Sequence, residues 1–114
     1  MNAEDPHSTL HTDGSVATAI RNLSEPYTTN SDTLDEDDYT LFVDIDDGDT
    51  IFIPNANTCG GRIYFFRNKD LNDTFYIKAV GNHIDNWPNI ALGPENGVII
   101  QSDGGTSWWR IADF

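Results

Sequence analysis

Basic residues are scarce in this sequence. Six lysine and arginine residues stand against 19 aspartate and glutamate residues, and the formal net charge is −13. Such a chain repels nucleic acid backbones and anionic membrane surfaces, so we expect neither as a partner. The charge is open to three interpretations: solubility in crowded surroundings, a cation site, or adaptation to high salt.

Cysteine and long apolar runs are also scarce. Cys59 is the single cysteine, which excludes an intrachain disulfide and a zinc site built on several thiolates. Its neighbours Thr58, Gly60 and Gly61 are typical of a loop, and no histidine lies near it in the sequence, so we expect no catalytic thiol. No apolar run has the length needed to cross a bilayer. The first residues lack a basic segment followed by an apolar one, so we expect no signal peptide.

Leucine is rare beside the β-branched residues, with 6 Leu against 11 Ile and 11 Thr. β-branched side chains lose rotamer freedom in helices and pack well on pleated sheets. Alternating apolar and polar residues between Gly, Asp and Asn turns predict strands. The sequence therefore predicts an all-β fold, namely a small antiparallel β-sandwich or jelly-roll-like domain, or a short barrel-like meander. The expected strands cover residues 39–46, 50–53, 62–67, 74–80, 98–101 and 108–111, and residues 81–97 are expected to form a long loop.

The first third of the chain differs in character from the remainder. Residues 1–38 are polar, acidic and poor in aromatic residues, which predicts an N-terminal attachment arm and linker before a β-domain at 39–114. The apolar spacing of Val16, Ile20 and Leu23 predicts a short helix in this arm. About two helical turns are marginal on their own, so this helix would have to dock on another surface.

An ordered set of strand and turn sequences in this chain resembles a β-domain common at the ends of bacteriophage tail fibres and head fibres. The resemblance runs from Tyr39 to Ile111. It departs from the usual pattern at Asn86, where a glycine normally follows Ile-Asp, and in the richer loop with Trp87 and Pro88. The matching pieces are YTLFVD, DTIFIP, GRIYFFRN, FYIK, IDN, VIIQSDG and WWRI, which begin at Tyr39, Asp49, Gly61, Phe75, Ile84, Val98 and Trp108.

The resemblance implies a homotrimeric virion appendage with no catalytic residues and no cofactor. We expect a short fibre or spike that is made in the host cytoplasm and exposed on the capsid, at a vertex or on the tail. In such proteins the N-terminal part usually attaches the appendage to the particle. The arm, with Val16, Ile20 and Leu23, is therefore expected to bind other virion proteins, such as capsid, penton or tail proteins.

Acidic residues gather around the turn at 44–49, whose spacing is similar to a calcium loop. Calcium takes several oxygen ligands, but Gly48 occupies one ligand position and the closing glutamate is missing, so we expect a solvated turn and no metal site. A cation on the axis of a trimer is an open alternative. His7 and His11 lie four residues apart without helical signals, which disfavours a metal pair. Glycoside hydrolysis needs a shaped cleft and a carboxyl group in apolar surroundings, which a domain of this size rarely builds, so we expect no enzyme.

The tryptophans are candidate contact residues. Trp108 and Trp109 are adjacent on one expected strand and must face opposite sides of it, so one of them is expected in the core. Trp87 lies in the long loop beside amide and carboxylate groups, which are the partners that a sugar needs around a stacking ring. The alternative is that Trp87 packs on its own domain or in the trimer interface. The candidate residues for a glycan or host receptor are His83, Asp85, Asn86 and Trp87.

A second class of function remains open, namely a carbohydrate-binding module of a bacterial surface or secreted protein. That function predicts a stable monomer with measurable sugar affinity, whereas the fibre predicts a homotrimer. An enzyme would instead show turnover that is lost on replacing one carboxylate.

Overall fold

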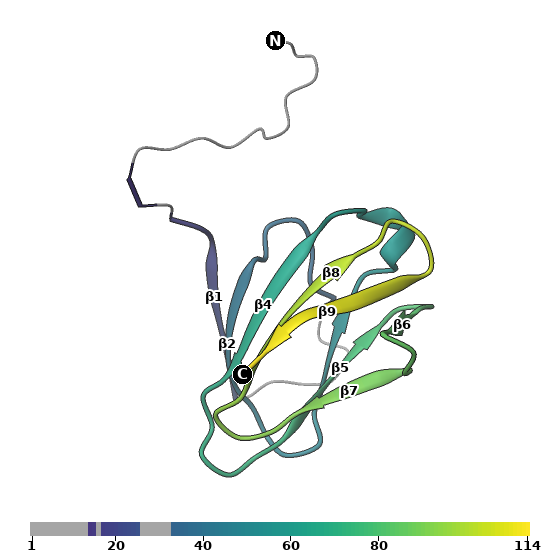
Figure 1. The fold of residues 1–114 in the computed structure, drawn as a ribbon. Coiled ribbons are helices and arrows are strands. Elements are labelled where there is room, and N and C mark those ends of the chain that lie inside the picture. Colours follow the sequence, from purple (N-terminus) through teal and green to yellow (C-terminus); the bar gives the residue numbers. More distant parts are fainter. Residues whose placement is uncertain (1–13, 16, 26–32) are drawn as a thin grey trace.

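The computed structural model describes residues 14–15, 17–25 and 33–114, which form two β-sheets packed face to face (Figure 1). Within this part of the chain the helical structure is a single 3-10 turn, and no helix is long and apolar enough to cross a membrane. The all-β class predicted from the sequence is confirmed. The elements are β1 (Ile20–Ser24), β2 (Thr40–Asp44), β3 (Thr50–Ile53), η1 (Ala56–Thr58), β4 (Ile63–Asn68), β5 (Phe75–Ala79), β6 (His83–Ile84), β7 (Asn89–Leu92), β8 (Gly97–Ser102) and β9 (Ser107–Asp113).

The two sheets are mixed, and the antiparallel sandwich expected from the sequence is wrong in this respect. The large sheet has the order β1-β2-β4-β8-β9-β6 and the small sheet the order β3-β5-β7. The pairs β1–β2, β2–β4, β3–β5 and β6–β9 are parallel, and the pairs β4–β8, β5–β7 and β8–β9 are antiparallel. From β2 to β5 the chain alternates between the two sheets. β4 therefore lies beside β2 in the large sheet and β5 beside β3 in the small sheet, and both pairs are parallel. The turns after β2 and β4 therefore cross between sheets and do not close hairpins.

The N-terminal helix predicted through Ile20 and Leu23 is a strand instead. β1 pairs in parallel with β2 along its length, with Ile20 opposite Thr40 and Leu23 opposite Val43. A two-turn helix has little intrinsic stability, whereas the backbone groups at the edge of β2 offer a full set of hydrogen bonds. Leu23 is buried and Ile20 is 61% exposed. Val16 lies outside the described residues.

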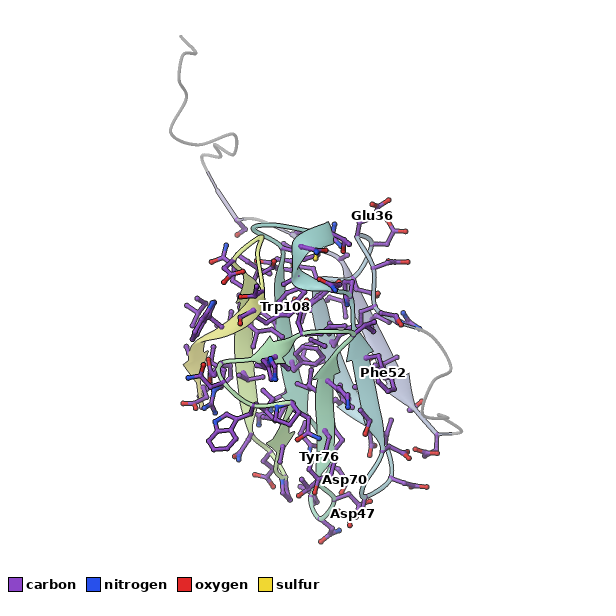
Figure 2. All side chains as sticks on the ribbon, turned by 90° about the vertical axis from the view of Figure 1, so that its right-hand side faces the viewer. Glu36, Asp47, Phe52, Asp70, Tyr76 and Trp108 are labelled. Carbon is purple, nitrogen blue, oxygen red and sulfur yellow. The ribbon has the colours of Figure 1, made fainter. Side chains whose placement is uncertain are left out.

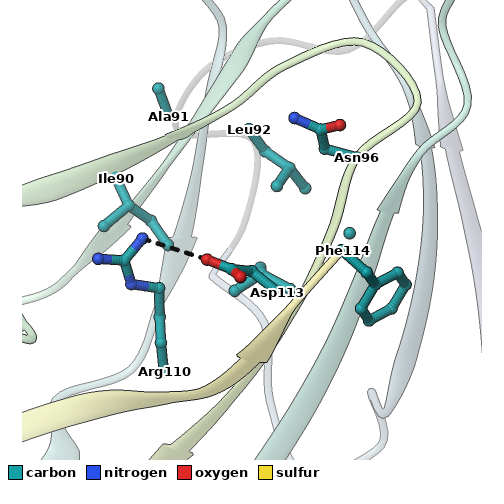
Figure 3. A pocket seen from close by; sticks show the side chains of 9 residues that line it. Ile90, Ala91, Leu92, Asn96, Arg110, Asp113 and Phe114 are labelled. Carbon is teal, nitrogen blue, oxygen red and sulfur yellow. Dashed lines mark ion pairs between the residues drawn. The ribbon is translucent and has the colours of Figure 1, made fainter.

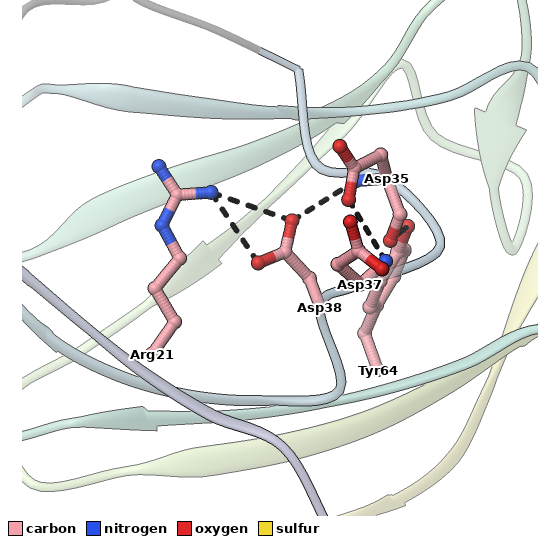
Figure 4. Close-up of polar contacts among 5 residues, drawn as sticks. All are labelled: Arg21, Asp35, Asp37, Asp38 and Tyr64. Atoms are coloured by element: carbon pink, nitrogen blue, oxygen red, sulfur yellow. Dashed lines mark hydrogen bonds and ion pairs between the residues drawn. The ribbon is translucent and has the colours of Figure 1, made fainter.

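The segment before β2 is held against the same sandwich. Leu34 is buried, and its backbone N–H donates to the carbonyl oxygen of Phe52 on β3 at 2.9 Å. The buried carboxylate of Asp38 pairs with Arg21 of β1 at 3.3 Å and accepts from the backbone N–H of Asp35 at 3.0 Å (Figure 4). β1 and residues 33–38 are thus fixed to the strands that follow.

The core lies between the two sheets and is centred on Trp108 (Figure 2). The indole is fully buried, stacks on Tyr64 with ring centroids 5.4 Å apart, and donates to the carbonyl oxygen of Pro54 at 2.9 Å. Burial raises the pKa of Tyr64 to about 12, so its hydroxyl stays protonated and donates to the carbonyl oxygen of Asp35 at 3.0 Å. Trp109 is 41% exposed, as expected for the neighbour of a core residue on a strand. The other large buried side chains are Phe66, Phe75, Leu34, Leu41, Ile51, Ile53, Ile77, Ile84, Ile100 and Val43.

The stretch 81–97, expected to be a loop, contains two short strands. β6 pairs with the start of β9, and β7 completes the small sheet beside β5. β6 has only two residues, and the apolar patch of β7 lies inside a stretch that otherwise has the composition of a loop. Ile90 and Leu92 of β7 are buried, so this stretch contributes to the core.

Candidate binding surfaces

The turn after β6 presents Trp87 to solvent. The backbone groups of Ile84 and Trp87 bond each other in both directions, at 2.9 and 3.0 Å, and close a tight turn. Asp85 adopts a φ of 56°, a left-handed conformation that Asp tolerates better than most residues. Trp87 is 60% exposed and Asn86 beside it is also exposed. The turn therefore holds an aromatic face and an amide outward on a short, fixed loop.

Asp85 has a structural role in this turn. Its carboxylate accepts from the backbone N–H of Arg110 at 3.0 Å and pairs with the Arg110 guanidinium at 2.5 Å. Both carboxylate oxygens are thus engaged with β9. His83 is exposed on β6. Of the four candidate residues from the sequence, Asn86 and Trp87 lie together with exposed polar and aromatic groups, while Asp85 ties the turn to the sheet.

A cleft lies at the open edge of the sandwich between β7, β8 and β9 (Figure 3). Its volume is about 230 Å³, below the roughly 300–1,000 Å³ of ordinary ligand pockets. Arg110 and Asp113 form an ion pair across it at 3.8 Å. Because Arg110 is also paired with Asp85, its charge is already balanced. The cleft therefore offers little to an anionic ligand.

Acidic side chains gather at one end of the molecule, where Figure 2 shows Asp47 and Asp70 together. Carboxylate oxygens of Glu25, Asp46 and Asp49 all lie within 4.8 Å of one another. The sequence pointed to Asp46 and Asp49, but not to Glu25, which the fold brings there from the end of β1. Three such oxygens are ligands that a divalent cation accepts. Exposed acidic groups of this kind are also common without an ion.

Two carboxyl groups at this end have raised pKa values. Partial burial, together with the negative charge of Glu25, raises the pKa of Asp49. A hydrogen bond with Asp70 raises the pKa of Asp44. At the other end of the sheet the opposite holds: the indole N–H of Trp109 donates to Asp103 at 2.9 Å and, with the backbone N–H groups of Gly105 and Ser107, lowers the pKa of Asp103.

Removing the charge of Asp49 and that of Asp103 should change stability in opposite directions. The raised pKa of Asp49 means that the folded state binds its proton more tightly, so stability falls as pH rises through that range. Asp49→Asn should therefore raise the melting temperature at neutral pH. The lowered pKa of Asp103 means that its ionised form stabilises the fold, a contribution lost as pH falls. Asp103→Asn should lower the melting temperature.

Thermal unfolding of both variants beside the wild type checks this pair. The two differences from wild type should shrink in acid, where every carboxyl group is protonated. Melting-temperature shifts in the same direction at neutral pH would contradict the destabilising effect assigned to the Asp49 charge and the stabilising effect assigned to the Asp103 charge.

The outer face of the large sheet is apolar, which is unusual for a sheet that faces solvent. Strands β2, β4 and β8 turn Leu41, Tyr64 and Ile100 inward, so the alternate residues point outward. In register across the strands, these outward residues form rows with two charged side chains, Arg67 on β4 and Asp44, which lies opposite Ser24 at one end of the face. We define the outer face by three rows: Ile20–Thr40–Phe65–Ile99–Ala112, Ile63–Gln101–Trp109, and Asn22–Phe42–Arg67–Gly97.

These features define a two-sheet all-β protein with an exposed aromatic turn, an acidic end and an apolar outer sheet face. No protein-family model, curated protein or solved structure matches the chain.

Proposed function

We propose that the protein is a structural subunit of a virion, a short homotrimeric fibre or spike exposed on the particle. The observation that carries this proposal is the apolar outer face, because a large sheet with apolar side chains on both sides needs cover on both sides. The sequence pieces that resemble phage fibre domains support it, since they fall on β2, β3, β4, β5, β6, β8 and β9 and on turns next to them. We also propose that the two-sheet sandwich is jelly-roll-like.

The proposed subunit has no catalytic role. The described clefts are small or shallow, and the acidic residues lie mostly in exposed turns. Attachment to other virion proteins is assigned to the N-terminal arm. Of the expected attachment residues, Ile20 is exposed at the sheet edge, while Leu23 packs inside its own sandwich.

Contact with a host surface is assigned to the turn of Asn86 and Trp87. The exposed indole supplies a stacking face and the amide supplies hydrogen bonds, which suits a glycan. The same turn is the observation that favours the second candidate function, a carbohydrate-binding module. The two functions differ in assembly, because a module of that kind works as a monomer.

The molar mass of the purified protein by size exclusion with light scattering tests the proposal. We expect three times the chain mass of 12.7 kDa. A single-chain mass at every concentration would contradict the trimer and favour the carbohydrate-binding module, which glycan screening would then examine. In that screen, loss of sugar binding on replacing Trp87 with alanine would identify the turn as the site.

A further inference from the structure

We propose that the outer face of the large sheet is the surface on which copies of this chain associate, with Phe65 and Ile99 at its centre. The inference rests on the proposed function and specifies the partner and the surface. The partner is a second copy of the chain. The alternatives, namely another protein on this face or association through the small sheet, are outcomes of the experiment below.

The central row of the face is uncharged across five strands. It runs from Ile20 at the β1 edge through Thr40, Phe65 and Ile99 to Ala112 on β9. Phe65 and Ile99 are half-buried, and the ring of Tyr39 lies 5.1 Å from that of Phe65. A continuous row of this kind gives a partner an apolar strip with few charges to desolvate, which is the composition of an interface core.

The size of the face suits the centre of an interface. Five strands about 4.8 Å apart and five residues of about 3.3 Å each give an area of roughly 350 Å². A standard interface buries about 800 Å² on each partner, with an apolar core and a polar rim. Asn22 at the β1 edge of its row and Gln101 within the neighbouring row supply such polar groups. A shallow hollow of about 360 Å³ between Phe42, Arg67 and Lys69 leaves room for a side chain of the partner.

Charge favours association through this face. The chain carries −13, so two copies repel each other through most surfaces. On the defined rows the only charged residue is Arg67, which is exposed and forms no ion pair with another described residue. The acidic cluster of Glu25, Asp46 and Asp49 lies in turns at the end of the sandwich, off these rows. Copies that meet on this face therefore bring together the least acidic part of the sheet.

The small sheet provides a comparison. Its outward aromatic residues, Phe52 and Tyr76, lie in different rows and are labelled in Figure 2. Phe52 shares its row with Lys78 and Asn89, while Tyr76 lies between Thr50 and Ala91. This face is only three strands wide and its apolar groups are interrupted. It is therefore the weaker candidate and the source of a matched control.

The experiment compares the molar mass by light scattering of the wild type, Phe65→Glu and Phe52→Glu over a dilution series. Both variants place a carboxylate at a half-buried phenylalanine that points away from the core. We expect Phe65→Glu to have the mass of one chain and Phe52→Glu to keep the wild-type mass. Near-ultraviolet circular dichroism from the stacked Trp108 and Tyr64 reports that each variant is folded.

A second variant keeps the test decisive if Phe65→Glu fails to fold. Thr40→Glu changes a residue of the same row that is already polar and half-buried, so folding should tolerate it. We expect it to raise the concentration at which copies dissociate by at least about tenfold, which corresponds to about 1.4 kcal/mol.

The outcomes separate this inference from the proposed function. An oligomer unchanged by Phe65→Glu and Thr40→Glu, or lost in Phe52→Glu alone, would overturn the surface and leave the trimeric fibre standing. A wild-type mass of two chains, lost in Phe65→Glu, would support the surface and contradict the trimer. A wild-type monomer at all concentrations would overturn both the association surface and the homotrimer. A different protein would then be the partner that covers the outer face.

Discussion

Replacing Trp108 with alanine should lower the free energy of unfolding by about 3–5 kcal/mol, the range found when a buried large aromatic residue is truncated. The side chain has no exposed surface, stacks on Tyr64 and donates to the carbonyl oxygen of Pro54. Alanine removes this buried area, opens a cavity between the sheets and leaves the Pro54 carbonyl without its donor. A loss of this size is a large fraction of the stability of a small domain.

Trp87→Ala is the matched control for this change. Trp87 is 60% exposed, and the contacts of its turn are made by backbone groups that alanine retains. Its replacement should change the free energy of unfolding by less than about 1 kcal/mol. Urea unfolding followed by far-ultraviolet circular dichroism measures both variants. Equal losses in the two variants would contradict the central place of Trp108 in the core.

Replacing Asn68 with leucine should lower the free energy of unfolding by about 3 kcal/mol, although the two side chains are similar in size. Asn68 is 1% exposed at the end of β4. Its amide donates to the carbonyl oxygens of Asp73 at 2.9 Å and Leu92 at 3.0 Å, and its side-chain oxygen accepts from the backbone N–H of Asp70 at 2.9 Å. Leucine leaves these groups without their partner, and a buried group such as the Leu92 carbonyl oxygen costs about 1–3 kcal/mol when it has none, whereas the half-buried groups of Asp70 and Asp73 cost less.

Asn68→Asp should make the stability of the protein depend on pH through this position. A carboxylate can still accept from Asp70, but it faces two carbonyl oxygens and cannot donate to them. Burial and these oxygens raise its pKa in the folded state, so the variant is less stable at neutral pH and recovers stability as pH falls. Asn86→Leu, at an exposed position, is the control and should change stability little. A small effect at Asn68 would contradict its assignment as the polar link between β4 and the small sheet.

The strands were predictable where a run rich in β-branched and aromatic residues stands between turn residues. β2, β3, β4, β5, β8 and β9 all lie within one or two residues of their expected bounds. β1 was missed because Ile20 and Leu23 satisfy helical spacing as well as a strand, and only pairing with β2 decides between them. β6 has only two residues, and β7 was missed because Ile90, Ala91 and Leu92 form a short apolar patch inside a stretch that otherwise has the composition of a loop.

The candidate surfaces were predictable only in part. The sequence pointed to Trp87 and Asn86 because an aromatic ring beside amide and carboxylate groups in a long loop is what a sugar-binding site uses. It could not show that Asp85 is held by Arg110, which lies 25 residues away on β9. Glu25 joins Asp46 and Asp49 only because β1 lies beside β2 in the large sheet.

The sequence by itself determined the all-β class, the positions of the six longer strands and the acidic character of the chain. These follow from properties that are local to a few residues: the two-residue period of a strand, the preference of β-branched side chains for a pleated surface, and the count of ionisable groups. Only the tertiary structure decided which strands pair and in which direction. The same Asp-Gly turn at Gly48 can close a hairpin or cross to a second sheet, and it crosses here. The physical reason is that β2 and β3 bury their apolar sides against each other across the core, a contact between distant elements that no local pattern encodes.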